Sequence, residues 1–265
     1  MKLLIKVGGT LLDEAGGRDA IARQLADVAR EHQVVIVHGG GKQVTRFLEE
    51  RGIQSRFMGG LRVSDDAVIG AVTQVIAGAV NKQFVAALLA AGSRPVGISG
   101  IDGLLTSAVQ LDPALGAVGK PTDSDGHLLD LLAGAGYVSV VACIGGDRQG
   151  HIYNVNADQM AVSCAVGWRA NKLLFLTDVP GVRGSDGTVL RQLDRTGSQE
   201  LIESGVAHGG MQAKLEAAHS ALDQGVEEVL IAPGQEPDIC KRLLAGEILG
   251  TRMAEVLVPK KGMDA

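Results

Sequence analysis

The sequence predicts an α/β fold with an open, mainly parallel central sheet sandwiched between helices in three layers. Short apolar, β-branched runs alternate with segments of helical periodicity along the whole chain. Nearly every apolar run ends in glycine or aspartate, which are typical turn residues. The 37 glycines among 265 residues are about twice the usual share of roughly 7%. Many short turns between strands and helices would account for them.

The first half of the chain alternates regularly between the two patterns. Lys6 interrupts the first apolar run, and Asp65 or Ser64 can cap the longest helix. Residues 57–66 are polar and are expected to form a loop that carries Arg62. We expect strands at 3–7, 34–37, 94–99 and 137–144, helices at 21–31, 42–51, 66–91 and 128–135, and a hairpin within 106–119.

The second half continues the alternation. Asn156 can cap a helix that runs through Val166. We expect strands at 173–177, 227–232 and from 251, and helices at 193–204, 210–224 and 236–245. A boundary near Gly167 would give an N-terminal lobe (1–167) and a C-terminal lobe (168–265).

A glycine triplet follows the second apolar run, in the stretch from Val34 to Lys42 that contains Gly39, Gly40 and Gly41. This pattern predicts a strand, a glycine turn and the start of a helix. Free N–H groups and the positive end of the helix dipole meet at such a start, which makes it a natural anion site. The alternative is a tight turn without a ligand, and an isolated triplet would favour that alternative slightly.

Other strand ends shift the balance towards a binding site. In an open parallel sheet the carboxyl ends of the strands line the ligand crevice. One edge should therefore gather Lys6, Gly8, Gly9, the glycine triplet, Asn154 and Asp178.

Two lysines and one carboxylate suggest a chemistry for that edge. Lys6 and Lys214 each lie near a glycine pair, and Asp158 falls between them in sequence. Phosphoryl transfer requires positioning and neutralisation of a negatively charged group, which such residues can supply. Each residue also has a purely structural explanation. The lysines could be surface amines, and Asp158 could simply occupy the first turn of a helix, where a carboxylate is favoured. Arg62 could be a surface charge, although its planar guanidinium suits bidentate binding of a carboxylate.

Composition argues against several other classes of protein. A net charge of −5 without a long basic run disfavours nucleic-acid and acidic-membrane binding. No apolar stretch is judged long and unbroken enough to span a bilayer. The three separated cysteines suggest reduced core thiols of a cytosolic protein. The sequence has no P-loop, protein-kinase signature, dinucleotide fingerprint, hydrolase elbow or paired histidines for a metal.

Seven ordered blocks resemble the amino acid kinase family, from Lys6 to about Thr251. They are Lys6-Val-Gly-Gly, Val37-His-Gly-Gly-Gly, Gly60-Leu-Arg-Val-Ser, Asn81-Lys82, Asn154-Val-Asn-Ala-Asp-Gln, Thr177-Asp-Val-Pro-Gly-Val and Gly209-Gly-Met-x-x-Lys. The third and fifth blocks favour the acetylglutamate branch of the family.

The resemblance implies an αβα sheet of the amino acid kinase type. It also implies ATP-dependent phosphorylation of the side-chain carboxylate of N-acetyl-L-glutamate, in arginine biosynthesis. Lys6 and Lys214 would stabilise the moving phosphoryl group, and Asp158 would hold both lysines without acting as a base. Mg²⁺ would be carried by the ATP phosphates with few protein ligands, so no residue is assigned to a metal.

The resemblance also divides the binding residues between two ligands. Amides of Gly8, Gly9 and Gly41 would face phosphoryl oxygens, while His38 and His208 are expected to be structural rather than catalytic. The acylated amino acid would be held by Gly40, Gly41, Arg62 and Asn154. The nucleotide would be held by Gly8, Gly9, Asp178, Gly181, Val182, Arg183, Gly209 and Gly210.

Some features leave the function open. Gly59, Ile101 and Leu104 depart from the family pattern on the substrate side, so a related acid such as an aminoadipate derivative is an alternative substrate. A non-catalytic nucleotide or amino-acid sensor on the same fold is a second alternative. The chain starts directly at its first strand, which suggests a homodimer without arginine feedback.

Overall fold

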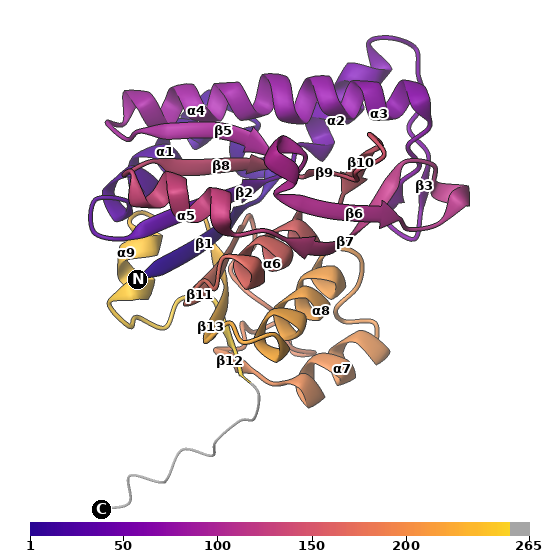
Figure 1. Cartoon of the computed structure of the whole chain (residues 1–265). Coiled ribbons are helices and arrows are strands. Elements are labelled where there is room, and N and C mark those ends of the chain that lie inside the picture. Colours follow the sequence, from indigo (N-terminus) through magenta and orange to yellow (C-terminus); the bar gives the residue numbers. More distant parts are fainter. Residues whose placement is uncertain (255–265) are drawn as a thin grey trace, which may run out of the picture.

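The computed structural model describes residues 1–254 and has a mainly parallel eight-stranded sheet at its centre (Figure 1). The predicted α/β class is confirmed. The strand order is β12-β14-β13-β11-β1-β2-β8-β5, and only the β13–β14 pair is antiparallel. The strands are β1 (Lys2–Val7), β2 (Gln33–His38), β5 (Pro95–Ser99), β8 (Val138–Ala142), β11 (Lys172–Thr177), β12 (Gln192–Leu193), β13 (Glu228–Pro233) and β14 (Thr251–Met253).

Helices cover both faces of this sheet. One face carries α1 (Ala15–Val28), α4 (Asn81–Ala90) and α9 (Ile239–Leu244), and the other carries α5 (His127–Gly134), α6 (Ala157–Gly167) and α8 (Gly210–Asp223). Leucine, isoleucine and valine of β1, β2 and β11 are buried, as expected for strands covered on both faces. Other helices include α2 (Gly41–Glu49), α7 (Arg195–Glu203) and the short 3₁₀ segments η1 (Gly9–Leu12), η3 (Asp102–Leu104) and η4 (Pro113–Leu115).

The longest helical run covers 66–90 and consists of α3 (Asp66–Val72), a π-helical segment (Thr73–Val80) and α4. Asp65 caps it by accepting from the Val68 N–H. Its length and mean hydropathy of 1.3 suffice for a membrane span, so the judgement that no stretch is long and apolar enough was wrong. Its inner face packs against the sheet, where Asn81 donates to the carbonyl of Val140 in β8. Core helices of soluble proteins can be equally long and apolar, so length and hydropathy do not by themselves identify this run as a membrane span.

Short strands form two structures beside the main sheet. A small closed barrel contains the expected hairpin of β6 (Thr106–Gln110) and β7 (Val118–Ser124) together with β9 (Ile144–Gly146) and β10 (Ile152–Val155). The apolar run expected as one strand over 137–144 is divided at Cys143 into β8 and β9. Residues 57–62 were expected as a loop, but they pair as the hairpin β3 (Phe57–Met58) and β4 (Leu61–Arg62).

Candidate active site

Two glycine turns lie side by side at the carboxyl edge of the sheet. Strands β1 and β2 are parallel and in register, with Val7 opposite His38, so the turns that follow them leave the sheet together. A Cβ added to Gly9 would lie 3.6 Å from both the nitrogen and the Cα of Gly40. The backbones of the two turns therefore lie within van der Waals distance of a side-chain position at Gly9. The expected convergence of these turns is present in the structure.

Lys6, Asp158 and Lys214 meet next to these turns. The Lys6 Nζ lies 2.8 Å from Asp158 Oδ1, and the Lys214 Nζ lies 3.2 Å from Asp158 Oδ2. The three side chains come from β1, α6 and α8, and all are largely excluded from solvent. Asn156 accepts from the Asp158 N–H at 2.8 Å and thus fixes the first turn of α6. One carboxylate consequently spaces two ammonium groups in one place.

Electrostatics keep this cluster charged. Burial alone would raise the pKa of Asp158, but the charges of Lys6 and Lys214 outweigh burial and lower the pKa below 3.8. Burial is the largest influence on Lys214 and lowers its pKa below 10.5, in spite of the opposing attraction of Asp158. Two cations and one anion leave a net positive charge, and a buried positive charge attracts an anionic ligand.

The backbone amides of the glycine turns differ in their availability. The Gly8 N–H donates to the Leu176 carbonyl at 2.9 Å, so it continues the sheet ladder. The expectation that this amide faces a phosphoryl group is therefore wrong. Gly41 begins α2 and Gly40 precedes it as the N-cap, which leaves first-turn N–H groups at the crevice. Gln43 connects the two turns, since its Nε2 donates to the Gly9 carbonyl at 3.3 Å.

Arg62 is buried and held by other residues of the same region. Its Nη2 donates to the Gly41 carbonyl at 3.0 Å and to Thr45 Oγ1 at 2.8 Å, and its Nη1 donates to Ser55 Oγ. The guanidinium also lies 4.7 Å from the centroid of the Phe57 ring. It is not the surface charge of the alternative interpretation. Among residues 1–254 its Nε–H and the second proton of Nη1 have no hydrogen-bond acceptor, so they can bind a carboxylate.

A cavity of about 190 Å³ lies between the glycine triplet, Arg62 and the start of α6. Asn154 lines it and donates to Ser64 Oγ at 3.1 Å. Val44, Val72 and Ile76 give it an apolar wall. A small molecule with anionic ends and a short apolar group would match this lining.

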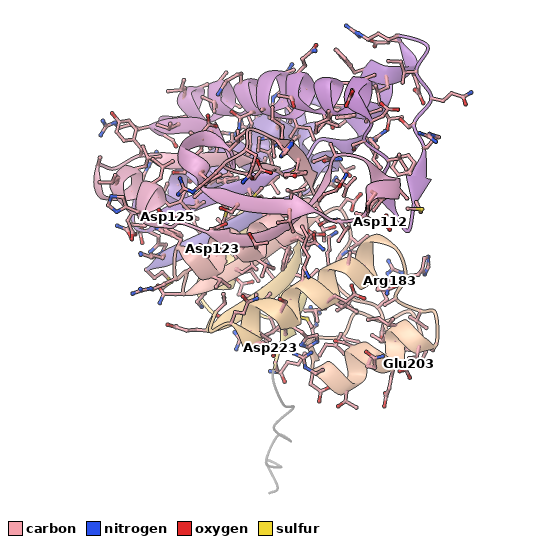
Figure 2. The ribbon with its side chains drawn as sticks, turned by 45° about the vertical axis from the view of Figure 1, so that its right-hand side comes forward. Asp112, Asp123, Asp125, Arg183, Glu203 and Asp223 are labelled. Atoms are coloured by element: carbon pink, nitrogen blue, oxygen red, sulfur yellow. The ribbon has the colours of Figure 1, made fainter. Side chains whose placement is uncertain are left out.

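Most of the residues expected to hold a nucleotide lie between the end of β11 and the first residue of α8, while Gly8 and Gly9 follow β1. Asp178 follows β11, and burial would raise its pKa, but hydrogen bonds and the Lys42 charge lower it. Val182 is fully buried and its N–H donates to Thr251 Oγ1 at 2.9 Å, so that amide is occupied. Arg183 is exposed at the surface (Figure 2). Gly209, with φ 55°, caps α8, whose first residue is Gly210.

Sequence reasoning assigned no role at the site to Gln43, Thr45 or Ser55. Each contacts a turn or Arg62 from a position that only the fold brings close. For Gln43 a signal existed, because it stands two residues after the triplet, in the first turn of the expected helix. Within residues 1–254, no cluster of three His, Cys, Asp or Glu residues could form a metal site of its own.

Comparisons with known proteins identify relatives of this chain. The family model described as "Amino acid kinase family" matches residues 1–233. "Acetylglutamate kinase" of Solibacter usitatus (strain Ellin6076) is 56% identical over 254 residues, which cover 96% of this chain and 99% of that protein. The protein of the same name from Acidobacterium capsulatum is 44% identical, covering 91% of this chain and 95% of that protein.

Solved structures share the fold. N-acetylglutamate synthase from Neisseria gonorrhoeae, complexed with coenzyme A and N-acetyl-glutamate, matches with a TM-score of 0.85 and 27% identity. The match covers 97% of this chain and 60% of that longer one. The protein smu.665 from Streptococcus mutans UA159 matches with a TM-score of 0.82 and 27% identity, covering 96% and 98% of the two chains.

Proposed function

We propose, from the premise that this chain belongs to the amino acid kinase family, that it uses ATP to phosphorylate the side-chain carboxylate of N-acetyl-L-glutamate in arginine biosynthesis. The observation that carries this function is the meeting of Lys6 and Lys214 on Asp158, 2.8 and 3.2 Å away, beside two glycine turns. Full-length similarity to acetylglutamate kinases supports the substrate.

The proposed reaction uses the lysines as fixed positive charges. An oxygen of the acceptor carboxylate forms a bond to the γ-phosphorus of ATP while the bond to the bridging oxygen breaks, leaving ADP. Lys6 and Lys214 neutralise charge that spreads over the moving phosphoryl oxygens. Because the acceptor is already an anion, no base is needed, and Asp158 serves to hold both ammonium groups in place.

The phosphate donor follows from the family, while Mg²⁺ is our proposal. The described residues lack a carboxylate cluster that could cage a metal, so the ATP phosphates would supply most ligands. The ionised Asp178, exposed at the same edge, is the residue that fits a contact with such an ion or its water. When bound, the ion neutralises phosphate charge.

On the substrate side, we assign the acylated amino acid to the 190 Å³ cavity. Arg62 would bind a carboxylate with its remaining donors, and Asn154 and the turn of Gly40 and Gly41 would orient the rest of the molecule. A kinase for a longer acid, such as an aminoadipate derivative, is the rival within this class. The ratio of kcat/KM for the two acids distinguishes them.

On the nucleotide side, we assign Gly9, Asp178, Gly181, Arg183, Gly209 and Gly210 to ATP, with Gly8 and Val182 contributing backbone shape rather than a free amide. These residues, apart from the first turn, follow Gly167, which supports lobes of 1–167 and 168–265. The main sheet crosses that boundary through the β1–β11 pair. Motion of the lobes would therefore bend a continuous sheet.

We also propose a homodimer in the cytosol. The outer face of the helical run 66–90 presents small and apolar residues, including Gly70, Gly78, Ala86 and the exposed Leu89. A second copy of the chain is the partner expected on that face. Three buried free cysteines are consistent with a reducing compartment.

A coupled assay of ADP release with N-acetyl-L-glutamate tests the function. Lys6→Ala and Lys214→Ala should each fold but lower kcat by about 10²-fold or more, because each removes a charge that stabilises the transition state. Lys241→Ala, which removes an exposed ion pair with Asp27, is the control and should retain kcat. Near-normal turnover in either site variant would refute the proposal. Ligand binding without ADP release would indicate the sensor instead.

A further inference from the structure

A buried pair of side chains, His38 and Asn81, supports the glycine triplet from inside the fold. His38 is the last residue of β2 and Asn81 is the first residue of α4, and both are 0% exposed. Neither has a role in the binding and catalysis proposed above. Buried polar groups are costly unless their hydrogen bonds are satisfied, so their partners indicate why they are present.

The hydrogen bonds define the tautomer of the His38 ring. Its Nδ1 lies 2.9 Å from the Gly39 carbonyl, which can only accept, so Nδ1 carries the proton. Its Nε2 is then the unprotonated nitrogen and accepts from Asn81 Nδ2 at 3.0 Å. Burial lowers the pKa of His38 to about 4, which keeps the ring neutral near pH 7.

Asn81 fixes the other end of this chain of hydrogen bonds. The second proton of its Nδ2 goes to the Val140 carbonyl of β8 at 2.9 Å, and its Oδ1 accepts from the Lys82 Nζ at 3.0 Å. The amide can therefore take only one orientation, with its NH₂ group towards His38. The sheet and the long helix jointly determine which nitrogen of the ring is protonated.

The consequence reaches the active site through one rigid peptide group. The Gly39 carbonyl and the Gly40 N–H belong to the same planar trans peptide, so they point in opposite directions. Because the carbonyl is held by the His38 ring inside the fold, the Gly40 N–H is directed away from that ring. The Gly40 nitrogen lies beside Gly9, between the two turns. Glycine could otherwise rotate this peptide freely.

We propose that His38 and Asn81 are positioning residues that hold the Gly39–Gly40 peptide with its N–H directed at an anionic oxygen in the crevice. This inference rests on the proposed function. Neither residue touches the ligand; they act through the peptide. A donor that is oriented before the ligand arrives stabilises developing charge without reorganisation at the moment of reaction.

Two substitutions of His38 separate its two hydrogen bonds. In His38→Asn the Nδ2 can take the place of the ring Nδ1 and still donate to Gly39, while the bond with Asn81 is lost. In His38→Gln the side chain can accept from Asn81, but the bond to Gly39 is lost. We expect kcat to remain within about 5-fold for His38→Asn and to fall about 10²-fold for His38→Gln, at similar losses of Tm.

Asn81→Asp tests the same chain of hydrogen bonds from its other end. A carboxylate accepts a proton from Nε2, and in the neutral ring this leaves Nδ1 unprotonated opposite the Gly39 carbonyl. We expect kcat to fall as in His38→Gln although His38 is intact. NMR of ¹⁵N-histidine-labelled protein should show the Nδ1–H tautomer in the parent chain and its loss in Asn81→Asp. His219→Gln, at a buried histidine that contacts Ser198 at 2.7 Å, should lower Tm without changing kcat.

Three results would overturn the inference. These are an Nε2–H tautomer in the parent chain, equal kcat for His38→Asn and His38→Gln, or unchanged kcat in folded Asn81→Asp. The tautomer measurement requires no variant, so it stands even if the substitutions prevent folding. Absence of ADP release by the parent chain would instead refute the proposed function, which separates the two failures.

Discussion

At the scale of single residues, the site depends on one carboxylate with two ammonium partners. Asp158 is buried, and burial of an unpaired charge would be prohibitive, but Lys6 and Lys214 both face it. Asp158→Asn would leave two like charges together. We expect a loss of about 3–5 kcal/mol in the free energy of unfolding, the usual cost of breaking a buried pair, and a fall in kcat of at least about 10²-fold.

Denaturant titration and the ADP-release assay measure both effects. Asp223→Asn is the matched control, since it removes an exposed ion pair with Arg195 at the surface shown in Figure 2. Its cost should be at most about 1 kcal/mol, without a change in kcat. Equal stability losses for the two variants would contradict the buried, paired state of Asp158.

Activity and stability should depend on pH in opposite directions: kcat should fall at high pH, whereas the free energy of unfolding should fall at low pH. Lys214 must be charged to act, and its pKa lies below the ordinary 10.5, so kcat should fall as pH rises through that lowered value. Asp158 has a lowered pKa in the folded state, so its stabilisation is present above pH 3.8 and is lost as pH falls through the folded value. A kcat–pH profile that stays flat up to pH 10.5 would contradict the assignment of Lys214.

At this scale the sequence predicted a site residue correctly where a charged side chain interrupts an apolar strand. Lys6 lies in an apolar strand beside glycines, and a buried lysine there needs an anion. Arg62 could not be placed in the same way, because Ser55 and Thr45 reach it only through the β3–β4 hairpin and the first turns of α2. The Gly8 amide was misassigned because its partner, Leu176, lies on a strand remote in sequence.

At the scale of elements, long periodic segments were predictable and short ones were not. The central strands β1, β2, β8 and β11 have four apolar residues each, whereas β3 and β4 have two residues each and show no periodicity. Contacts between elements also depend on glycines, and which glycines allow a close approach is visible only in three dimensions. At Gly167, the end of α6, an added Cβ would lie 1.9 Å from the carbonyl oxygen of Ser124 in β7.

Gly167→Ala should therefore separate α6 from β7 and destabilise the fold by about 3 kcal/mol or more. Because α6 carries Asp158, kcat should fall as well. Gly134→Ala is the control, since nothing lies within 4 Å of its added Cβ, and it should be neutral or stabilising by up to about 1 kcal/mol. Thermal unfolding of both variants measures the difference. Similar Tm values would show that β7 and α6 are not in close contact.

At the scale of the whole molecule, one sheet joins the residues assigned to both ligands. Strand β1 is central, with β2 and its glycine triplet on one side and β11 and Asp178 on the other. The order of the strands followed from no local signal, since it depends on how crossovers bring remote strands together. The convergence of their carboxyl ends was predictable, because it follows from parallel strands in general.

The assembly of two chains gives the last prediction. Light scattering after size exclusion should report twice the 27.4 kDa of the chain. An added Cβ at Gly78, on the outer face of the helical run 66–90, would meet nothing within 4 Å in its own chain. Gly78→Leu should therefore fold as a monomer but weaken the dimer, because the larger side chain meets only a second copy. Gly134→Leu, equally open, is the control and should leave the mass doubled. A parent chain that elutes as a monomer at micromolar concentration, with full activity, would exclude both the dimer and any need for it.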